Sequence, residues 1–105
     1  MCGIFGVRGV EDAGALAHLG LYSLQHRGQE SAGIVAVDDD GDARAVRSMG
    51  LVSEGLRTDA PSALRGSMAI GHTRYSTAGS STIENAQPVL ARFRDGHIAL
   101  AHNGN

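Results

Sequence analysis

The sequence predicts a small α+β domain in which strands outnumber helices. Three observations support this class. Short apolar runs bounded by turn-forming residues recur along the chain, one segment has apolar residues at helical spacing, and two strand-like runs flank Asp95-Gly96, a strong β-hairpin signal. With 105 residues, the chain has room for one domain with a modest core.

The first part of the chain predicts a strand, a helix and a hairpin. Residues 2–7 form an apolar run typical of a strand, and residues 13–24 carry apolar side chains at helical spacing between an acidic start and a basic end. Residues 33–37 and 43–47 indicate two strands joined by the acidic turn at 38–42. That turn lacks the ligand spacing and distal Glu of a calcium loop, so we interpret it as solvated.

The second part predicts fewer regular elements. Residues 51–56 indicate a short helical turn, residues 58–66 an irregular segment and residues 68–72 a strand. Residues 73–87 are rich in Ser, Thr, Asn and Gly and predict a long loop, a kind of segment that often carries function. The hairpin strands are expected at 89–94 and 97–102.

Composition excludes several classes of protein. The net charge of −2 gives no electrostatic reason to expect nucleic acid as a partner. The single cysteine excludes an intrachain disulfide, which suits a reducing cytosol. No apolar run is long enough to cross a bilayer and no signal peptide precedes the first strand, so we expect no membrane association and a cytoplasmic location. The chain ends directly after a strand-like run, and we therefore expect a fragment of a longer protein.

The one cysteine stands directly behind the initiator methionine, in "MCGIFG". A small second residue normally permits removal of Met1, which would place the Cys2 thiol beside a free α-amine. Reference pKa values of about 8 for an α-amine and about 8.5 for a thiol allow the amine to act as general base for its own side chain. Taken alone, "MC" more often marks a small buried side chain in a first strand.

Three distant segments favour a catalytic Cys2 over a merely packed one. "LQHRGQESAGI", "GHTRYSTAGSSTIENAQPV" and "AHNGN" place polar residues between strand-like runs. Together with "MCGI", in this order, they resemble the glutaminase domain of class II glutamine amidotransferases, which are N-terminal nucleophile hydrolases. The longer strings are most similar to the branch that transfers ammonia to phosphoribosyl pyrophosphate, in the first committed step of purine synthesis.

The resemblance spans nearly the whole chain and implies its architecture. The family fold is an αββα four-layer sandwich with antiparallel sheets, of which only the first part would be present. Residues 1–105, or 2–105 after removal of Met1, would form a partial glutaminase domain, inactive alone. The family's phosphoribosyltransferase domain would be absent from this chain, as would the aspartate that binds the glutamine α-amino group.

The resemblance also assigns roles to individual residues. It implies that the Cys2 thiolate attacks the glutamine side-chain amide, and that the Asn103 side chain and the Gly104 N–H stabilise the oxyanion. A second set would bind glutamine. It consists of Arg74, which matches the family residue that binds the α-carboxylate, together with Thr77, Tyr75 and Arg27. For Arg27, compensation of charge at the helix end is an equally good interpretation, and the "NG" of residues 103–104 taken alone is more often a turn.

The same resemblance implies the cofactors and the partners, and alternatives to it remain. No metal ligand set is expected in the chain. Magnesium is expected in the missing phosphoribosyltransferase domain, and the iron–sulfur ligands of some family members would lie outside this stretch. Glutamine and phosphoribosyl pyrophosphate would be the small-molecule substrates, and the full-length protein is expected to be a homo-oligomer. Two alternatives remain, the glutaminase domain of another class II enzyme such as glucosamine-6-phosphate synthase, and a non-catalytic binding domain with a packed Cys2.

Overall fold

The computed structural model describes residues 1–56, 64–75 and 82–103. Along the chain its elements are β1 (Gly3–Arg8), α1 (Ala13–Ser23), the 3₁₀ turn η1 (Gln25–Arg27), β2 (Ser31–Val37), β3 (Ala43–Met49), α2 (Val52–Gly55), β4 (Met68–Arg74), η2 (Ile83–Asn85), β5 (Val89–Phe93) and β6 (Gly96–Leu100).

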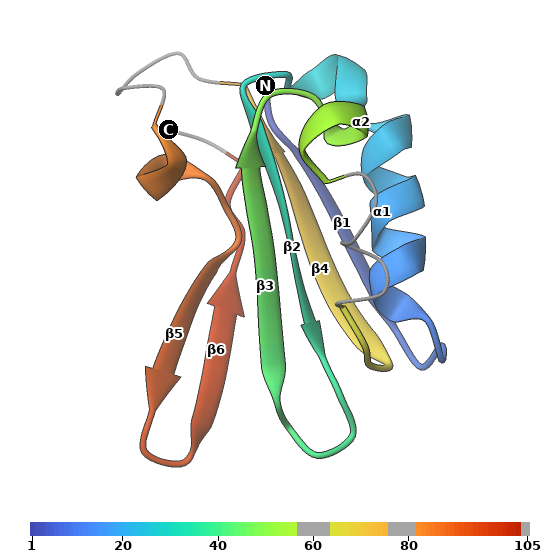
Figure 1. Ribbon diagram of the computed structural model, residues 1–105, viewed down its shortest axis with the longest axis vertical. Coiled ribbons are helices and arrows are strands. Elements are labelled where there is room, and N and C mark those ends of the chain that lie inside the picture. Colours follow the sequence, from blue (N-terminus) through green and yellow to red (C-terminus); the bar gives the residue numbers. More distant parts are fainter. Residues whose placement is uncertain (57–63, 76–81, 104–105) are drawn as a thin grey trace.

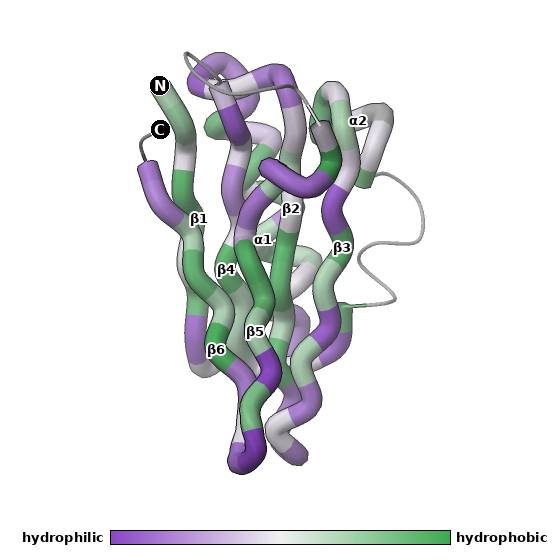
Figure 2. The backbone as a smooth tube through the Cα atoms, turned by 90° about the vertical axis from the view of Figure 1, so that its left-hand side faces the viewer, coloured by the Kyte–Doolittle hydropathy of each residue, from purple (hydrophilic) through white to green (hydrophobic). Residues whose placement is uncertain are grey.

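The strands form two antiparallel sheets. One has four strands in the order β1-β4-β2-β3, and the other is the β5–β6 hairpin. Helices α1 and α2 cover one face of the four-stranded sheet, and the hairpin lies against the opposite face (Figures 1 and 2). The described residues therefore form a helix layer, a central sheet and the beginning of a second sheet, which confirms the α+β class.

Alternation along β4 divides the central sheet into two faces, because successive side chains of a strand point to opposite sides. Ala69 belongs to the core packed against α1, and Gly71 contacts Leu21 of that helix. Met68 and Ile70 point the other way and line an apolar pocket that His97 and Ala99 of the hairpin border. The face toward the helices thus holds the core, and the face toward the hairpin lies outside it.

Small side chains let α1 pack closely on the sheet. The core cluster is formed by Ala13, Ala17, Leu21, Ala32, Ile34, Ala36, Val52, Leu56, Leu64 and Ala69. A Cβ at Gly20 would clash with the ring of Phe5, and one at Gly14 would clash with the backbone of Leu64. Glycines on the buried side of α1 therefore set the distance between the helix and its neighbours.

The observed elements agree with the sequence expectations to within a few residues, with one informative difference. The expected loop at 73–87 begins later, because β4 continues through Arg74. Thr73 pairs with Gly3 of β1, and Arg74 pairs with Ser31 of β2, so strands on both sides extend β4. Most of the irregular segment expected at 58–66 lies outside the described residues.

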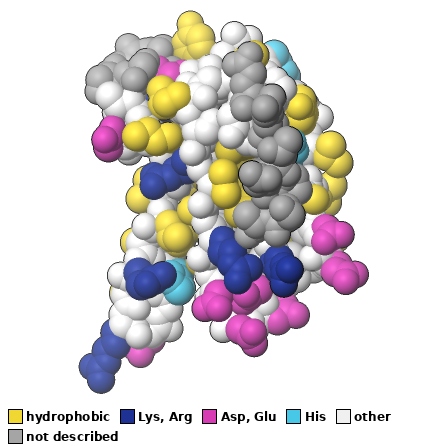
Figure 3. Space-filling model, viewed as in Figure 1, with side chains coloured by type: hydrophobic (Ala, Val, Ile, Leu, Met, Phe, Trp, Pro, Cys, Tyr) yellow, Lys and Arg dark blue, Asp and Glu magenta, His cyan; other side chains and the backbone are white. Residues whose placement is uncertain are grey.

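Two turns behave as predicted. The Asp95-Gly96 hairpin forms, with Val89 opposite Leu100 and Phe93 opposite Gly96. In the acidic turn after β2, Asp38 Oδ1 accepts hydrogen bonds of 3.0 Å from the N–H groups of Asp40 and Asp42. Exposed carboxylates gather at this end of the molecule (Figure 3), as expected of a solvated turn.

In the described ranges no helix is long and apolar enough to cross a membrane.

Leu21→Ala tests whether the α1 face supplies the core. Leu21 is fully buried, so truncation should leave a cavity and lower the free energy of unfolding by about 2–5 kcal/mol in urea denaturation. Leu19→Ala is the matched control, because Leu19 is 61% exposed on the same helix and should change stability by about 0.5 kcal/mol or less. Equal effects of the two substitutions would contradict this packing.

Candidate active site

Three chain segments meet at one end of the central sheet. Cys2 immediately precedes β1, Tyr75 immediately follows β4, and Asn103 lies three residues beyond the end of β6. Antiparallel pairing of Gly3 with Thr73 places the start of β1 beside the end of β4. Figure 1 shows the N-terminus and the end of the described chain, coloured red, at this same end of the molecule.

Cys2 is held from two directions. Its backbone nitrogen donates a 3.0 Å hydrogen bond to Asn103 Oδ1, and its Sγ lies 3.7 Å from the carbonyl oxygen of Tyr75. The residue is only 3% exposed. Because Oδ1 of Asn103 accepts from Cys2, the other atom of that amide, Nδ2, is a donor at the same place.

Arg27 contacts both Met1 and Cys2 at the N-terminus. Its Nε donates a 2.9 Å hydrogen bond to the Cys2 carbonyl oxygen, and its Nη2 lies 3.8 Å from Met1 Sδ. The turn η1 that carries Arg27 is tied to α2, because Gln25 Oε1 accepts a 2.7 Å bond from the Val52 N–H. Arg27 therefore contacts the main chain of the nucleophile candidate from an anchored turn.

Gly28 permits close contact between η1 and β4. A Cβ at this position would lie 2.6–2.9 Å from the backbone atoms of Arg74. The φ angle of Gly28 is −168°, which is extended, so the requirement is for space and not for a left-handed conformation. Its N–H donates a 3.2 Å bond to the Gln25 carbonyl, so Gly28 both ends the turn and packs closely.

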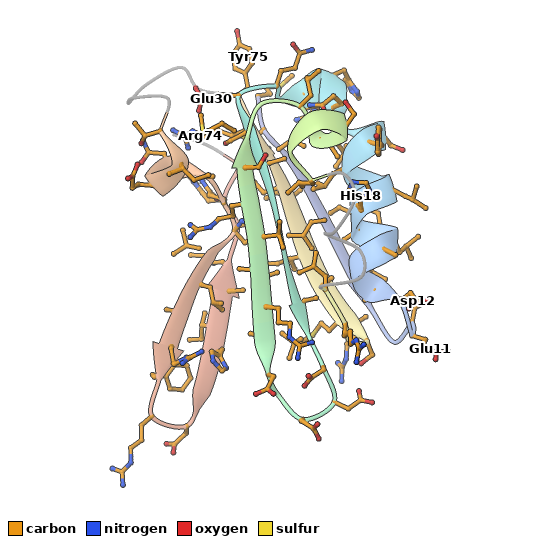
Figure 4. The ribbon with its side chains drawn as sticks, viewed as in Figure 1. Glu11, Asp12, His18, Glu30, Arg74 and Tyr75 are labelled. Atoms are coloured by element: carbon orange, nitrogen blue, oxygen red, sulfur yellow. The ribbon has the colours of Figure 1, made fainter. Side chains whose placement is uncertain are left out.

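Arg74 forms an ion pair at the end of the sheet. Its Nε lies 2.8 Å from Glu30 Oε2, and the side chains are 10% and 15% exposed. The Glu30 N–H also donates a 3.0 Å bond to the Arg74 carbonyl oxygen. Figure 4 shows this pair beside the end of the sheet from which the half-exposed Tyr75 ring projects.

His72 lies two residues before Arg74 on β4, is buried, and contacts the segment that carries Asn103. Its Nε2 lies 2.9 Å from the His102 carbonyl oxygen. Burial lowers the pKa of His72 below its usual value of about 6.5; the bond to His102 opposes this shift, and the charges of Arg74 and His102 add to it. The neutral ring must then carry its proton on Nε2, because a carbonyl oxygen can only accept.

The structure brings five of the seven predicted site residues to one end of the sheet: Cys2, Arg27, Arg74, Tyr75 and Asn103. The other two, Thr77 and Gly104, lie outside the described residues. Sequence reasoning gave no role to Glu30 or Gln87. Both lie within the quoted motifs, but their partners become visible only once the strand register is known. In the described ranges no three His, Cys, Asp or Glu side chains form a group that could hold a metal ion.

Comparison with solved structures defines the class of fold. The glutamine phosphoribosylpyrophosphate amidotransferase from B. subtilis, complexed with ADP and GMP, superposes with a TM-score of 0.86 and 45% identity, over 100% of this chain and 22% of that chain. A structure described as the allosteric regulatory enzyme of purine biosynthesis gives 0.85 and 44% over 94% of this chain. The fold is thus that of the N-terminal nucleophile hydrolase region of a class II glutamine amidotransferase.

Sequence comparison specifies the member of that class. Amidophosphoribosyltransferases from Lacticaseibacillus casei, Synechococcus elongatus and Bacillus subtilis are 55%, 51% and 50% identical over 99% of this chain. The chain spans 54% of the first relative's length and 21–22% of the other two. The chain is therefore homologous to the N-terminal region of amidophosphoribosyltransferases. No protein-family model matches it.

The buried neutral His72 predicts a pH-dependent stability. Its folded pKa is lowered, so below about pH 6.5 the unfolded chain binds a proton that the folded chain does not. Stability should therefore fall as the pH drops from about 7.5 to 5.5. His72→Gln should reduce this fall without removing it, because burial also lowers the pKa of His18. Urea midpoints of both proteins at several pH values measure the difference, and identical pH slopes would contradict a buried neutral His72.

Proposed function

We propose that this chain is the glutamine-hydrolysing part of an amidophosphoribosyltransferase and that Cys2 is its nucleophile. The observation that carries the proposal is the 3.0 Å contact between the Cys2 nitrogen and Asn103 Oδ1. It joins residues separated by 101 positions and places a thiol, its own backbone nitrogen and an amide donor in one place. That is the minimum set for amide hydrolysis by an N-terminal thiol.

The first steps follow from these atoms. After removal of Met1, the Cys2 nitrogen becomes an amine that donates one hydrogen to Asn103 Oδ1 and accepts the thiol proton with its lone pair. The thiolate forms a C–S bond to the glutamine side-chain carbonyl, and the π electrons move to the oxygen. Asn103 Nδ2 and the Gly104 N–H stabilise this oxyanion, a contribution of about 3–4 kcal/mol per donor.

The intermediate then breaks down in two stages. The proton held by the amine passes to the amide nitrogen, the C–N bond breaks and ammonia leaves a glutamyl thioester. The same amine next takes a proton from water, the resulting hydroxide adds to the thioester carbonyl, and the C–S bond breaks. Glutamate is released and the thiol is restored with the proton from the amine.

Arg74 provides the recognition element for glutamine in this proposal. A guanidinium matches a carboxylate in a geometry that Lys cannot reproduce, and the contact with Glu30 fixes the plane of the Arg74 group. In the same proposal Tyr75 and Thr77 contribute to glutamine binding, and Arg27 holds the Cys2 carbonyl in place.

The reaction of the whole protein is part of the proposal. Ammonia passes to phosphoribosyl pyrophosphate and gives phosphoribosylamine and diphosphate, with magnesium in a downstream phosphoribosyltransferase domain, and the ligands of an iron–sulfur cluster would lie outside residues 1–105. We propose a homo-oligomer in the cytoplasm, although relatives from Arabidopsis thaliana are named chloroplastic. The high identity to amidophosphoribosyltransferases supports this acceptor over that of a glucosamine-6-phosphate synthase.

A glutamine-like electrophile tests the nucleophile directly. Treatment of the full-length enzyme, which would contain this chain as its N-terminal region, with diazo-oxo-norleucine should leave one adduct on the N-terminal peptide. The adduct should be on Cys2, and Met1 should be absent. Mass spectrometry of the digested protein measures both facts. An unlabelled Cys2, or Met1 retained in active enzyme, would favour a packed cysteine in a binding domain.

Cys2→Ser separates the two half-reactions. In the longer enzyme, glutamine-dependent formation of phosphoribosylamine should fall by more than about 1,000-fold, because the nucleophile is lost. Activity with free ammonia should persist, since the acceptor chemistry lies in another domain. Parallel loss of both activities would contradict this division.

Arg74→Lys tests carboxylate recognition. Loss of the two-pronged contact should lower kcat/KM for glutamine by about 10- to 100-fold, equivalent to about 1.5–3 kcal/mol, and leave the ammonia-dependent rate unchanged. Arg92→Lys, on exposed strand β5, is the matched control and should leave both rates unchanged. An Arg74→Lys enzyme with normal glutamine kinetics would remove Arg74 from the binding site.

A further inference from the structure

We propose that His72 and Gln87 form a clamp on the backbone of His102 and thereby position Asn103 for the chemistry of Cys2. His72 Nε2–H donates to the His102 carbonyl oxygen at 2.9 Å, and Gln87 Oε1 accepts from the His102 N–H at 2.7 Å. Both backbone polar groups of the residue before Asn103 are therefore held by side chains from other parts of the chain. The catalytic meaning of the clamp rests on the proposed function.

The need for such a clamp follows from the end of the second sheet. Pairing between β5 and β6 ends with Val89 opposite Leu100, so residue 102 lies beyond the ladder. Asn103 itself is exposed, and burial therefore does little to fix it. Without the two side-chain contacts, the chain that carries the Asn103 amide would depend on its one bond to Cys2.

Both arms of the clamp are built on fixed supports. His72 is fully buried on the central strand β4, where it pairs with Gly33 of β2. Gln87 lies between the buried residues Ala86 and Pro88. A Cβ at Gly33 would meet the Gln87 carbonyl oxygen, so the glycine on the sheet is what lets the Gln87 backbone approach. Arg47 Nη1 adds a 3.3 Å bond to the Ala86 carbonyl.

The protonation of His72 suits the role of donor. Within the described residues its Nδ1 is buried without a hydrogen-bond partner, and burial favours the neutral ring. A neutral imidazole with its proton on Nε2 satisfies the His102 carbonyl and leaves Nδ1 bare. His72 and Gln87 are thus positioning residues, because they act through the His102 backbone and, within the part of the chain that the structure describes, hydrogen-bond to neither Cys2 nor the Asn103 side chain.

Matched substitutions in the longer enzyme test the clamp. His72→Met and Gln87→Met remove the donor and the acceptor at similar side-chain length, whereas His72→Gln and Gln87→Glu each retain one. With diazo-oxo-norleucine, the limiting rate of Cys2 inactivation should fall about tenfold or more in the Met variants, with the half-saturating concentration changed by less than about twofold. The Gln and Glu variants should recover most of the rate.

A second measurement does not depend on the reaction. Hydrogen exchange of the peptide that contains residues 100–103 should be faster in both Met variants and close to wild type in the Gln and Glu variants. Ammonia-dependent activity should stay unchanged in all four proteins, which shows that the acceptor domain is intact, and exchange of the β2 peptide (Ser31–Val37) at the wild-type rate shows that the glutaminase domain folds. If His72→Met does not fold, the Gln87 pair carries the same test.

The outcomes separate the two proposals. Normal inactivation and exchange in the Met variants would overturn the clamp, as would His72→Gln and Gln87→Glu being as slow as the Met variants. An unlabelled Cys2 in the wild-type enzyme would instead overturn the proposed function. In that case the exchange experiment still decides whether His72 and Gln87 hold the His102 backbone.

Discussion

The hydrogen bond from the Cys2 nitrogen to Asn103 Oδ1 is the contact on which the site depends. It joins the residue before the first strand to the residue that ends the described chain, so it can form only when both sheets are in place. Its two ends differ chemically in this structure, because the Cys2 nitrogen is a peptide N–H that can only donate and Oδ1 of Asn103 can only accept. The same bond therefore orients the amide and keeps its Nδ2 as a donor beside the Cys2 thiol.

The central sheet separates stability from chemistry by the alternation of its side chains. Residues toward α1 are small and apolar and allow close helix packing, as at Gly71 against Leu21. The opposite face of β4 carries His72 and Arg74; His72 contacts His102, which follows the second sheet, and Arg74 contacts Glu30, which immediately precedes β2. Strand β4 thus contributes to both the core and the site. Its extension through Arg74 brings His72 and Arg74 close to the end of the sheet at which Cys2 lies.

Much of this arrangement could be predicted from the sequence, for reasons that are local. The Asp95-Gly96 turn and the helical spacing of residues 13–24 each signal their structure within a few residues, whereas Cys2 is singled out only together with the three distant motifs. The contacts of Glu30, Gln87 and His102 could not be predicted, because they join residues 15 to 44 positions apart. They depend on strand register and on the close approach at Gly33, neither of which has a local signal.

A crystal structure of the longer enzyme with Met1 removed tests the central claim most directly. The measurement is the distance from the Cys2 α-nitrogen to Asn103 Oδ1, together with the position of Asn103 Nδ2. We expect the contact of about 3 Å to persist when the nitrogen becomes an amine, and Nδ2 to face the space in front of Cys2 Sγ. An amine more than about 4 Å from Asn103, or an Asn103 amide turned away from the thiol, would contradict it.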